Sequence, residues 1–404
     1  MTDPDRRELD LFFEQVAEGR VSRRQLLRRL GAAGLTMSSA GTLLAACGGV
    51  KGTDKGGPGK TTATHPQVAV KQLNFSNWPY YMDPKRNVLK EWSQAHNGAH
   101  VKYVEEINDL DEFFGKVRQQ LQRGETLNRD LVVLTDWMAS RWVRGQWVEA
   151  IDKRNVPNAK NLQPNLQHPN WDPNRNFSLP WQSGMSAIAY NPKKTGRKLH
   201  SINDLFDPKF KGKVTMLSDP HDSAGLMVLL AGKKTEDATL DDVLAGIDKI
   251  DQENKKGQIR RFTGNDYITD MAKGNAWVSV AYSGDLFQLR KDLPGVQFVI
   301  PDEGALLWTD NMMIPQKPPH VYAAETMMDF VYQPRIAAQL AAAINYVTPV
   351  AGTQEAMQKV DPTLVHNQLV FPDDTTRAKL HPYVTLSAAD ERKMNDAMQK
   401  VIGA

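Results

Sequence analysis

The sequence contains a single cysteine, Cys47, so the chain cannot form an internal disulfide. A charge excess is also lacking: the net charge is +3 at pH 7, whereas a protein that binds nucleic acid carries a clear basic excess. The motifs Gly-x-Ser-x-Gly and His-Glu-x-x-His are absent, and no cysteine follows Cys47. These absences argue against a hydrolase or a metalloprotease, and they favour a binding protein over an enzyme.

The composition is that of a folded soluble body. Apolar residues make up 41% of the chain and charged residues 24%, and a length of 404 residues favours two lobes over one domain. His96 and His100 have a spacing that could ligate zinc on a helix, but Asn97-Gly98 ends a helix between them and no third ligand is near. We therefore predict neither a metal ion nor a cofactor.

The first 46 residues have the pattern of an export signal. A twin arginine stands in Ser22-Arg23-Arg24-Gln25-Leu26-Leu27-Arg28, and a modest apolar stretch, 30–46, ends in Ala45-Ala46-Cys47-Gly48. The apolar stretch is too short and too weak for a membrane-spanning helix. A buried amphipathic helix is the alternative, but it explains neither the twin arginine nor the small residues before Cys47.

This segment resembles a bacterial twin-arginine signal joined to a lipobox. The resemblance implies cleavage before Cys47 and attachment of lipid to its thiol, and several acyl chains on one cysteine anchor a protein stably. Gly and Lys dominate the residues that follow, so 47–67 is expected to be a flexible tether. The folded body is predicted to begin near Val68, just off the outer face of a membrane.

Beyond Val68, short apolar runs alternate with helical patterns. Residues 130–135 form an apolar run suited to a buried strand, and an apolar stripe at helical period covers 110–121 with Asp109 placed as its cap. Phe262–Gly264 is expected to be a turn. Further strands are expected at 70–75, 101–104, 187–191, 214–217, 277–282 and 296–300, and further helices at 322–332, 336–344 and 388–401. The alternation predicts an α/β fold.

Aromatic residues recur where predicted strands end. Trp78 and Tyr81 follow the first strand, Trp137 follows the strand at 130–135, and Tyr282 ends a later one. Ligands of α/β sheets collect beyond the carboxyl ends of the strands. Each aromatic taken alone is more often a core residue, but the repetition at strand ends favours a binding site.

A second candidate group lies in Gly304–Pro315. Trp308 and Asp310 are two residues apart, and residues i and i+2 of an extended chain share a face. An aromatic face and a carboxylate together suit a cationic ligand. The alternative is a strand with one buried Trp, followed by an Asp that caps a helix.

Asp219 and Asp222 form a third group, directly after the strand predicted at 214–217. If Ser218 or Asp219 caps a helix, both carboxylates lie near the helix N-terminus, where negative charge is stabilising. Two roles stay open for them: helix caps, or carboxylates that meet a ligand.

Five motifs occur in a fixed order along the chain, and together they resemble the spermidine/putrescine-binding proteins of bacterial ABC importers. The resemblance covers roughly Val68 to the C-terminus. The motifs are Phe75-Ser76-Asn77-Trp78 with Tyr81, Asp130-Leu131-Val132-Val133, Asp207-Pro208-Lys209-Phe210-Lys211-Gly212, Leu307-Trp308-Thr309-Asp310 and Tyr346-Val347-Thr348-Pro349.

The resemblance implies the periplasmic-binding-protein fold, with two α/β lobes, hinge crossovers and a ligand cleft between them. One lobe would hold 68–180 and 309–354, and the other 181–308 and 355–404. The implied ligand is a polyamine, delivered by a monomer to an ABC permease in the membrane, and the alternative is another organic cation or an amino-acid-derived solute. The implied ligand-binding residues are Trp78, Tyr81, Trp137, Asp219, Asp222, Tyr282, Trp308 and Asp310.

Overall fold

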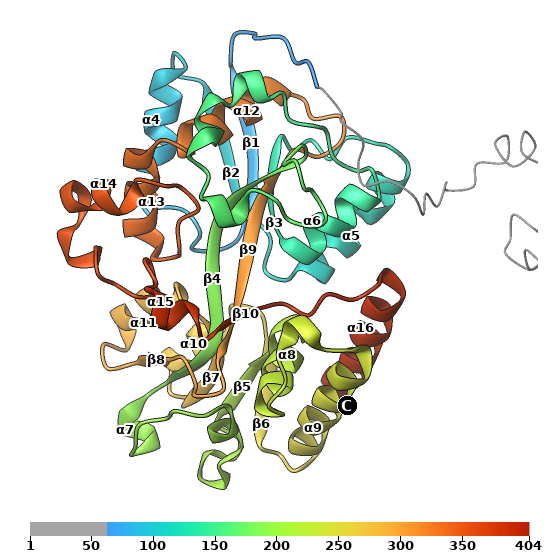
Figure 1. The fold of residues 1–404 in the computed structure, drawn as a ribbon, viewed down its shortest axis with the longest axis vertical. Helices are drawn as coiled ribbons and strands as arrows, with labels where there is room; N and C mark the ends of the chain where they lie inside the picture. The colour runs from blue at the N-terminus through green and yellow to red at the C-terminus, as the bar shows by residue number, and fades with distance from the viewer. Residues whose placement is uncertain (1–62, 404) are drawn as a thin grey trace, which may run out of the picture. The chain divides into compact units, whose positions relative to one another are not determined.

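A computed structural model describes residues 63–403 of the chain (Figure 1). The predicted signal, Cys47 and most of the predicted tether lie outside the described residues. Packing begins upstream of the expected start, since His65 Nδ1 lies 2.6 Å from Glu325 Oε1. Within residues 63–403, no helix combines the length and apolar character needed to cross a bilayer.

One mixed sheet runs through the described residues, in the order β2-β1-β3-β9-β4-β7-β5-β6, with β10 beside β9 and β8 beside β4. Its strands are β1 Gln72–Asn77, β2 His100–Glu105, β3 Leu131–Thr135, β4 Ser178–Tyr190, β5 Val214–Leu217, β6 Ile259–Thr263, β7 Val278–Tyr282, β8 Gln297–Val299, β9 Ala305–Met313 and β10 Leu380–Pro382.

Helices cover both halves of this sheet (Figure 1). They are α4 Asn87–Ala95, α5 Leu110–Gln122, α6 Asp136–Arg144, α7 Pro192–Thr195, α8 Pro220–Leu230, α9 Leu240–Lys255, α10 Tyr267–Ala272, α11 Asp285–Asp292, α12 Val321–Val331, α13 Pro334–Ile344, α14 Thr353–Val360, α15 Asp374–Arg377 and α16 Ala388–Ile402. Short 3-10 turns lie at Lys153–Asn155, Pro157–Asn161, Pro164–Leu166, Ile202–Phe206, Pro208–Phe210, Thr235–Asp237 and Pro362–Leu364.

Local pattern explains most of these elements. All residues of β3 and β5 are buried, as expected for short apolar runs inside a sheet. The α5 helix buries its predicted apolar stripe, and the Asp109 side chain accepts a hydrogen bond from the backbone N–H of Glu112 at its N-terminus. The turn expected at Phe262–Gly264 is wrong, because Phe262 and Thr263 are the last residues of β6.

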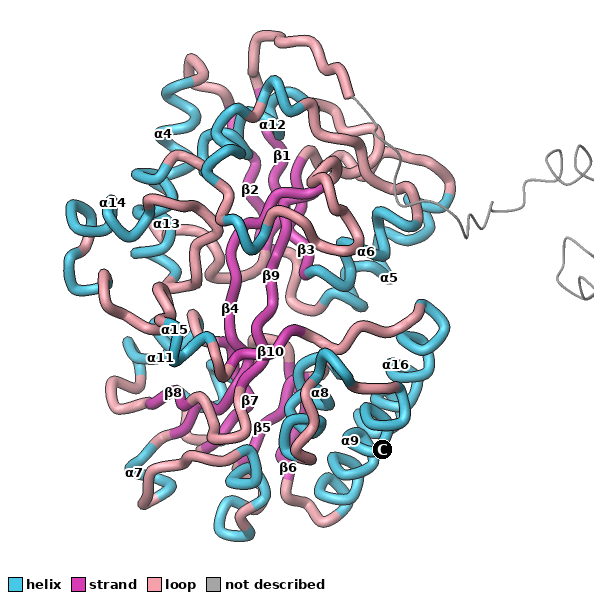
Figure 2. The backbone as a smooth tube through the Cα atoms, viewed as in Figure 1, coloured by secondary structure: helices cyan, strands magenta, loops and turns pink. Residues whose placement is uncertain are grey.

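The two long strands β4 and β9 connect the halves of the molecule (Figure 2). They pair antiparallel, and both run through two separate hydrophobic cores. Leu179 of β4 and Met312 of β9 belong to the core of the first lobe, whereas Ile188 and Leu306 belong to the core of the second. The predicted α/β fold with two lobes and crossovers between them is therefore confirmed.

The lobe boundaries themselves remain a prediction. Met357, Val365 and Val370 pack with Ala338 and Ala341 of α13, although the sequence analysis assigned 355–404 to the second lobe. The α13 helix belongs to the first lobe, because Ile336 and Leu340 lie in its core.

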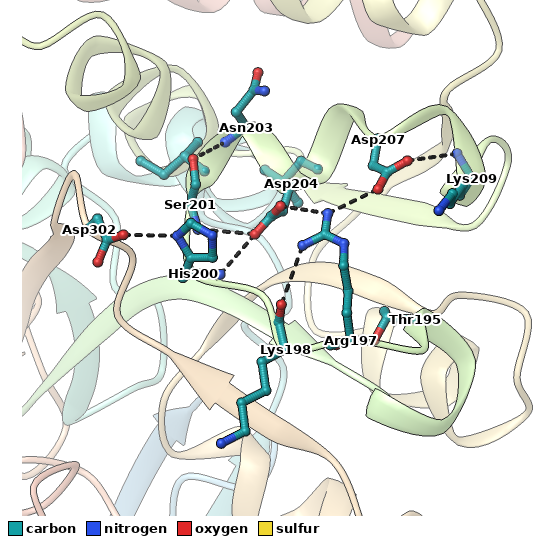
Figure 3. Close-up of polar contacts among 12 residues, drawn as sticks. Thr195, Arg197, Lys198, His200, Ser201, Asn203, Asp204, Asp207, Lys209 and Asp302 are labelled. Carbon is teal, nitrogen blue, oxygen red and sulfur yellow. Dashed lines mark hydrogen bonds and ion pairs between the residues drawn. The ribbon is translucent and has the colours of Figure 1, made fainter.

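The Asp207–Gly212 motif has a structural role in the second lobe (Figure 3). Asp207 Oδ1 accepts a hydrogen bond from the backbone N–H of Lys209 and caps a 3-10 turn. Arg197 bridges Asp204 and Asp207 at 2.7 and 2.9 Å, and Phe210 is buried in the core. This motif fixes the connection into β5 and lies outside the candidate site described next.

Candidate functional site

A cavity lies where strand ends of both lobes meet β9. Its walls are aromatic rings and carboxylates, and about 30 Å³ is free, room for about two water molecules. A larger guest therefore enters only if the lobes or the rings move apart. The residues that line it are Trp78, Pro79, Tyr81, Thr135, Asp219, Asn265, Tyr282, Asp285, Trp308, Asp310, Tyr346 and Tyr383.

Six of the eight predicted residues line this cavity. Trp78 and Tyr81 follow β1, Asp219 follows β5, Tyr282 ends β7, and Trp308 and Asp310 lie on β9. The alternative that Asp310 caps a following helix is wrong, since Asp310 lies inside the strand. The strand-end rule thus brought together residues more than two hundred positions apart in the sequence.

Trp137 and Asp222 lie just behind the wall. The Trp137 ring is covered by His221, with ring centroids 4.5 Å apart and planes at 17°. Asp222 is fully buried and accepts hydrogen bonds from Tyr282 at 3.1 Å, Tyr383 at 2.5 Å and Ser186 at 2.5 Å. Asp222 thus acts on the cavity through the phenols of Tyr282 and Tyr383.

Asp219 caps a helix, as one of the two open roles expected, and its position also leaves the ligand role open. Its side chain accepts a hydrogen bond from the backbone N–H of His221 and caps α8. It also faces the cavity.

Trp308 is the centre of the aromatic wall. Its Nε1 donates to Ser186 Oγ at 2.9 Å, which fixes the ring plane. Tyr282 and Tyr346 each lie with ring centroids 5.5 Å from it, at 84° and 54°. A Cβ added to Gly184, its partner on β4, would lie 2.3 Å from the indole, so only glycine lets the ring lie flat there.

Asp285 is the main residue that the sequence analysis missed. It begins α11 and is buried, and it accepts hydrogen bonds from three neutral donors: Tyr267 at 2.6 Å, Asn265 at 2.7 Å and Tyr346 at 3.0 Å. The strand-end rule could have found it, because Tyr282-Ser283-Gly284-Asp285 stands at the end of a predicted strand. A Cβ on Gly284 would lie 2.2 Å from the Tyr346 ring, so this glycine admits the ring.

Asn265 and Tyr383 were also missed, because each follows a strand with a weak pattern. Asn265 comes after β6, which has two exposed arginines, and Tyr383 comes after the three-residue β10. Tyr346 stood in a quoted motif without a role, and Thr135 and Pro79 were not singled out.

The carboxylates of this site have unusual electrostatics. Burial raises the pKa of Asp310 to about 7, although Thr135 Oγ1 donates to its carboxylate at 2.6 Å. Burial and the charge of Asp219 raise the pKa of Asp222 to about 7, and burial raises the pKa of Asp285. Among residues 63–403, no lysine or arginine pairs with any of these three carboxylates. The site is therefore a buried cavity in which these three carboxylates have no lysine or arginine partner among the described residues.

One polar atom in the wall, Asn265 Oδ1, lacks a partner among the described residues. This atom is buried and makes no hydrogen bond there, whereas the Tyr81 hydroxyl is buried beside the Asp310 carboxylate. Buried polar groups are nearly always paired, so an unpaired acceptor in a cavity wall is available to a hydrogen-bond donor of a ligand. Asn265 Oδ1 is an acceptor beside Asp285, which suits a donor-rich guest.

Comparison with known proteins places the chain in a family. Residues 129–374 match the family described as bacterial extracellular solute-binding protein. A putrescine/cadaverine-binding protein of Pseudomonas aeruginosa is 27% identical over 350 residues, which cover 81% of this chain and 92% of the relative. This relative confirms the resemblance to polyamine-binding proteins of ABC importers.

Solved structures show the same fold. A putative spermidine/putrescine ABC transporter from Listeria monocytogenes has a TM-score of 0.72 and 23% identity, and the match covers 82% of this chain and 98% of that chain. A periplasmic binding protein from A. tumefaciens R10, in complex with agropinic acid, has a TM-score of 0.66 and 21% identity, covering 83% and 99%. The chain is a member of the bacterial extracellular solute-binding protein family, whose members bind solutes for transport.

Proposed function

We propose that this protein captures a polyamine of the putrescine and spermidine class between its lobes and delivers it to an ABC permease in the membrane. The observation that carries the proposal is the set of buried carboxylates, Asp222, Asp285 and Asp310, without a paired lysine or arginine. A buried charge without a partner costs several kcal/mol, so a cationic guest that pairs with Asp285 and Asp310 in the wall, with Asp222 close behind it, gains that energy.

The aromatic wall suits the rest of such a ligand. A diamine has an ammonium group at each end and an apolar chain between them. Trp308 and Tyr346 offer apolar ring surface for the methylene groups. An ammonium group that lies over an aromatic ring adds about 0.5–2 kcal/mol per cation–π contact. A ligand favours the closed lobes only through its higher affinity for that form, and carboxylates that converge from β9 and α11 provide such a difference.

A thermal-shift series on the folded body tests this function. The panel is putrescine, cadaverine, spermidine, spermine, agmatine, arginine and agropinic acid. A ligand at about one hundred times its dissociation constant stabilises the native state by roughly 2.7 kcal/mol, which is seen as a rise in melting temperature. We expect selective shifts with one or two amines. Folded, ligand-free protein that responds to no amine would overturn the proposal, and a shift with arginine or agropinic acid alone would identify the alternative ligand class.

We further propose that Cys47 carries the lipid anchor and that the protein is exported. The support is the sequence of the leader, because this segment lies outside the described residues. Changing Cys47 to Ala is expected to release the exported protein from the membrane fraction, because the acyl attachment site is lost. Fractionation and immunoblotting measure this, with Ser38→Ala as a control inside the leader. Persistence of the Cys47 variant in the membrane fraction would exclude the anchor.

A further inference from the structure

His221 lies at the seam between the lobes and contacts both. It stands in the first turn of α8 in the second lobe, and its Nδ1 lies 2.8 Å from Asp219 Oδ1. Its ring stacks on Trp137 of α6, which packs in the first lobe. The imidazole is therefore held between a carboxylate that faces the cavity and an aromatic ring from the opposite lobe.

The groups around His221 are mostly acidic. Its side chain is only 3% exposed. Burial lowers its pKa, but the acids outweigh burial, and the net effect is a raised pKa. The neighbours on its own element are Asp219 and Asp222. From other elements it faces the acids Glu391 of α16 and Asp111 of α5, the phenol of Tyr383, and Arg141, whose guanidinium lies 5.2 Å from the Trp137 ring on α6.

The contacts of His221 with a carboxylate and an aromatic ring are of the same kind as those that the cavity offers to the ammonium group of a ligand. An imidazolium against a ring face and a carboxylate makes the same contacts as an alkylammonium in such a place. The difference is that here the cation belongs to the protein. Asp219 is thus paired already, whereas Asp285 and Asp310, which also line the cavity, have only neutral hydrogen-bond donors.

We infer that His221 is a specificity-determining residue: as a built-in cation it occupies Asp219 and the Trp137 ring, and so restricts the site to ligands with two ammonium groups. The inference rests on the proposed function. A third ammonium near Asp219 would meet an imidazolium of like charge instead of a free carboxylate, which costs binding energy in a buried site. A diamine has no third ammonium group to place near Asp219, so His221 does not affect its binding in this way.

The substitution His221→Asn tests the inference. Asn keeps a donor near Asp219 but has no charge, and the backbone N–H that Asp219 accepts is unchanged. The quantity to measure by calorimetry is the ratio of the spermidine Kd to the putrescine Kd. We expect this ratio to fall by about ten-fold, since a third ammonium gains a carboxylate partner worth about 1.4 kcal/mol. In the double variant His221→Asn with Asp219→Asn, the ratio should return to about its wild-type value.

A matched control exists on the surface of the second lobe. His200 Nδ1 lies 2.9 Å from Asp302 Oδ2, which is the same kind of pair far from the cavity (Figure 3). The substitution His200→Asn should leave the ratio unchanged. If His221→Asn weakens both ligands equally, His221 acts only as packing between the lobes, and the inference is wrong.

The wild-type protein gives a second test that needs no variant. Titration of the cavity carboxylates affects both amines, so it largely cancels in the ratio of their Kd values. The ratio should fall as the pH rises through the raised pKa of His221, because the imidazole then loses its positive charge. A constant ratio would overturn the inference while leaving polyamine binding intact. If neither amine binds the wild type at any pH, the proposed function itself fails.

Discussion

Changing Asp310 to Asn is expected to weaken the binding of a diamine at least about ten-fold while the fold survives. Asp310 is 3% exposed and lines the cavity, and the substitution removes the carboxylate that pairs with an ammonium. The Asn side chain keeps an oxygen that can accept the hydrogen bond from Thr135 Oγ1, so packing changes little. Isothermal titration calorimetry at about pH 8 measures the loss.

The same substitution should stabilise the ligand-free protein at high pH. The pKa of Asp310 rises from 3.8 to about 7 on folding, so the folded state holds the proton more tightly than the unfolded state. Stability linked to this group therefore falls as the pH rises from about 4 through 7. At about pH 8 we expect Asp310→Asn to gain about 2–4 kcal/mol, and at about pH 5 a smaller gain of about 1–2 kcal/mol. Urea unfolding at the two pH values measures the difference.

Asp136 provides the matched control for this variant. It is a neighbouring half-buried acid whose desolvation raises its pKa to about 6, and it accepts a hydrogen bond from Asn311, but it does not line the cavity. Asp136→Asn should also stabilise the protein at about pH 8, with a change in diamine affinity below about three-fold. Unchanged affinity in Asp310→Asn would remove Asp310 from the site.

The affinity for a diamine should fall roughly ten- to a hundred-fold between about pH 8 and about pH 6. Asp222 and Asp310 have pKa values of about 7 in the ligand-free protein. A proton on Asp310 competes directly with the ligand, and a proton on Asp222 removes a negative charge just behind the wall. The ammonium groups of the ligand stay charged throughout this range. Binding at about pH 7 should therefore release about one proton in total from the two groups, which titrate as a set.

Calorimetry in buffers with different ionisation heats counts these protons. In Asp310→Asn the release should drop to about half, because only Asp222 still titrates near neutral pH. An affinity independent of pH, with no proton released, would mean that the carboxylates are already ionised before the ligand arrives. That result would contradict the conclusion that burial raises the pKa values of Asp222 and Asp310.

The distribution of apolar residues was sufficient to predict much of the fold. The runs at β3 and β5 and the stripe of α5 form a strand or a helix in any context that buries them, so local pattern decides them. The strand β6 was missed because two of its five residues are exposed arginines. Its position follows from pairing with β5, which is a tertiary contact.

The residues of the candidate site also fall into two groups: those that local sequence pattern could predict and those that only tertiary packing brings to the cavity. Trp308 and Asp310 share a face because the strand geometry sets a period of two, and Trp78 and Tyr81 follow a strand end, so the sequence by itself could predict them. Asn265, Asp285 and Tyr383 join them only because β6, α11 and β10 pack at the same place. No local pattern encodes which strand ends become neighbours.

Only the tertiary structure decides the charge of this site. The sequence contains many aspartates, but burial, hydroxyl donors and the absence of a paired lysine or arginine determine which ones stay uncompensated. It also decides that His221 covers Trp137 and pairs with Asp219, so that two predicted ligand residues meet a side chain of the protein. Sequence determines which groups are available, whereas solvation and pairing depend on distances between distant parts of the chain, which only folding sets.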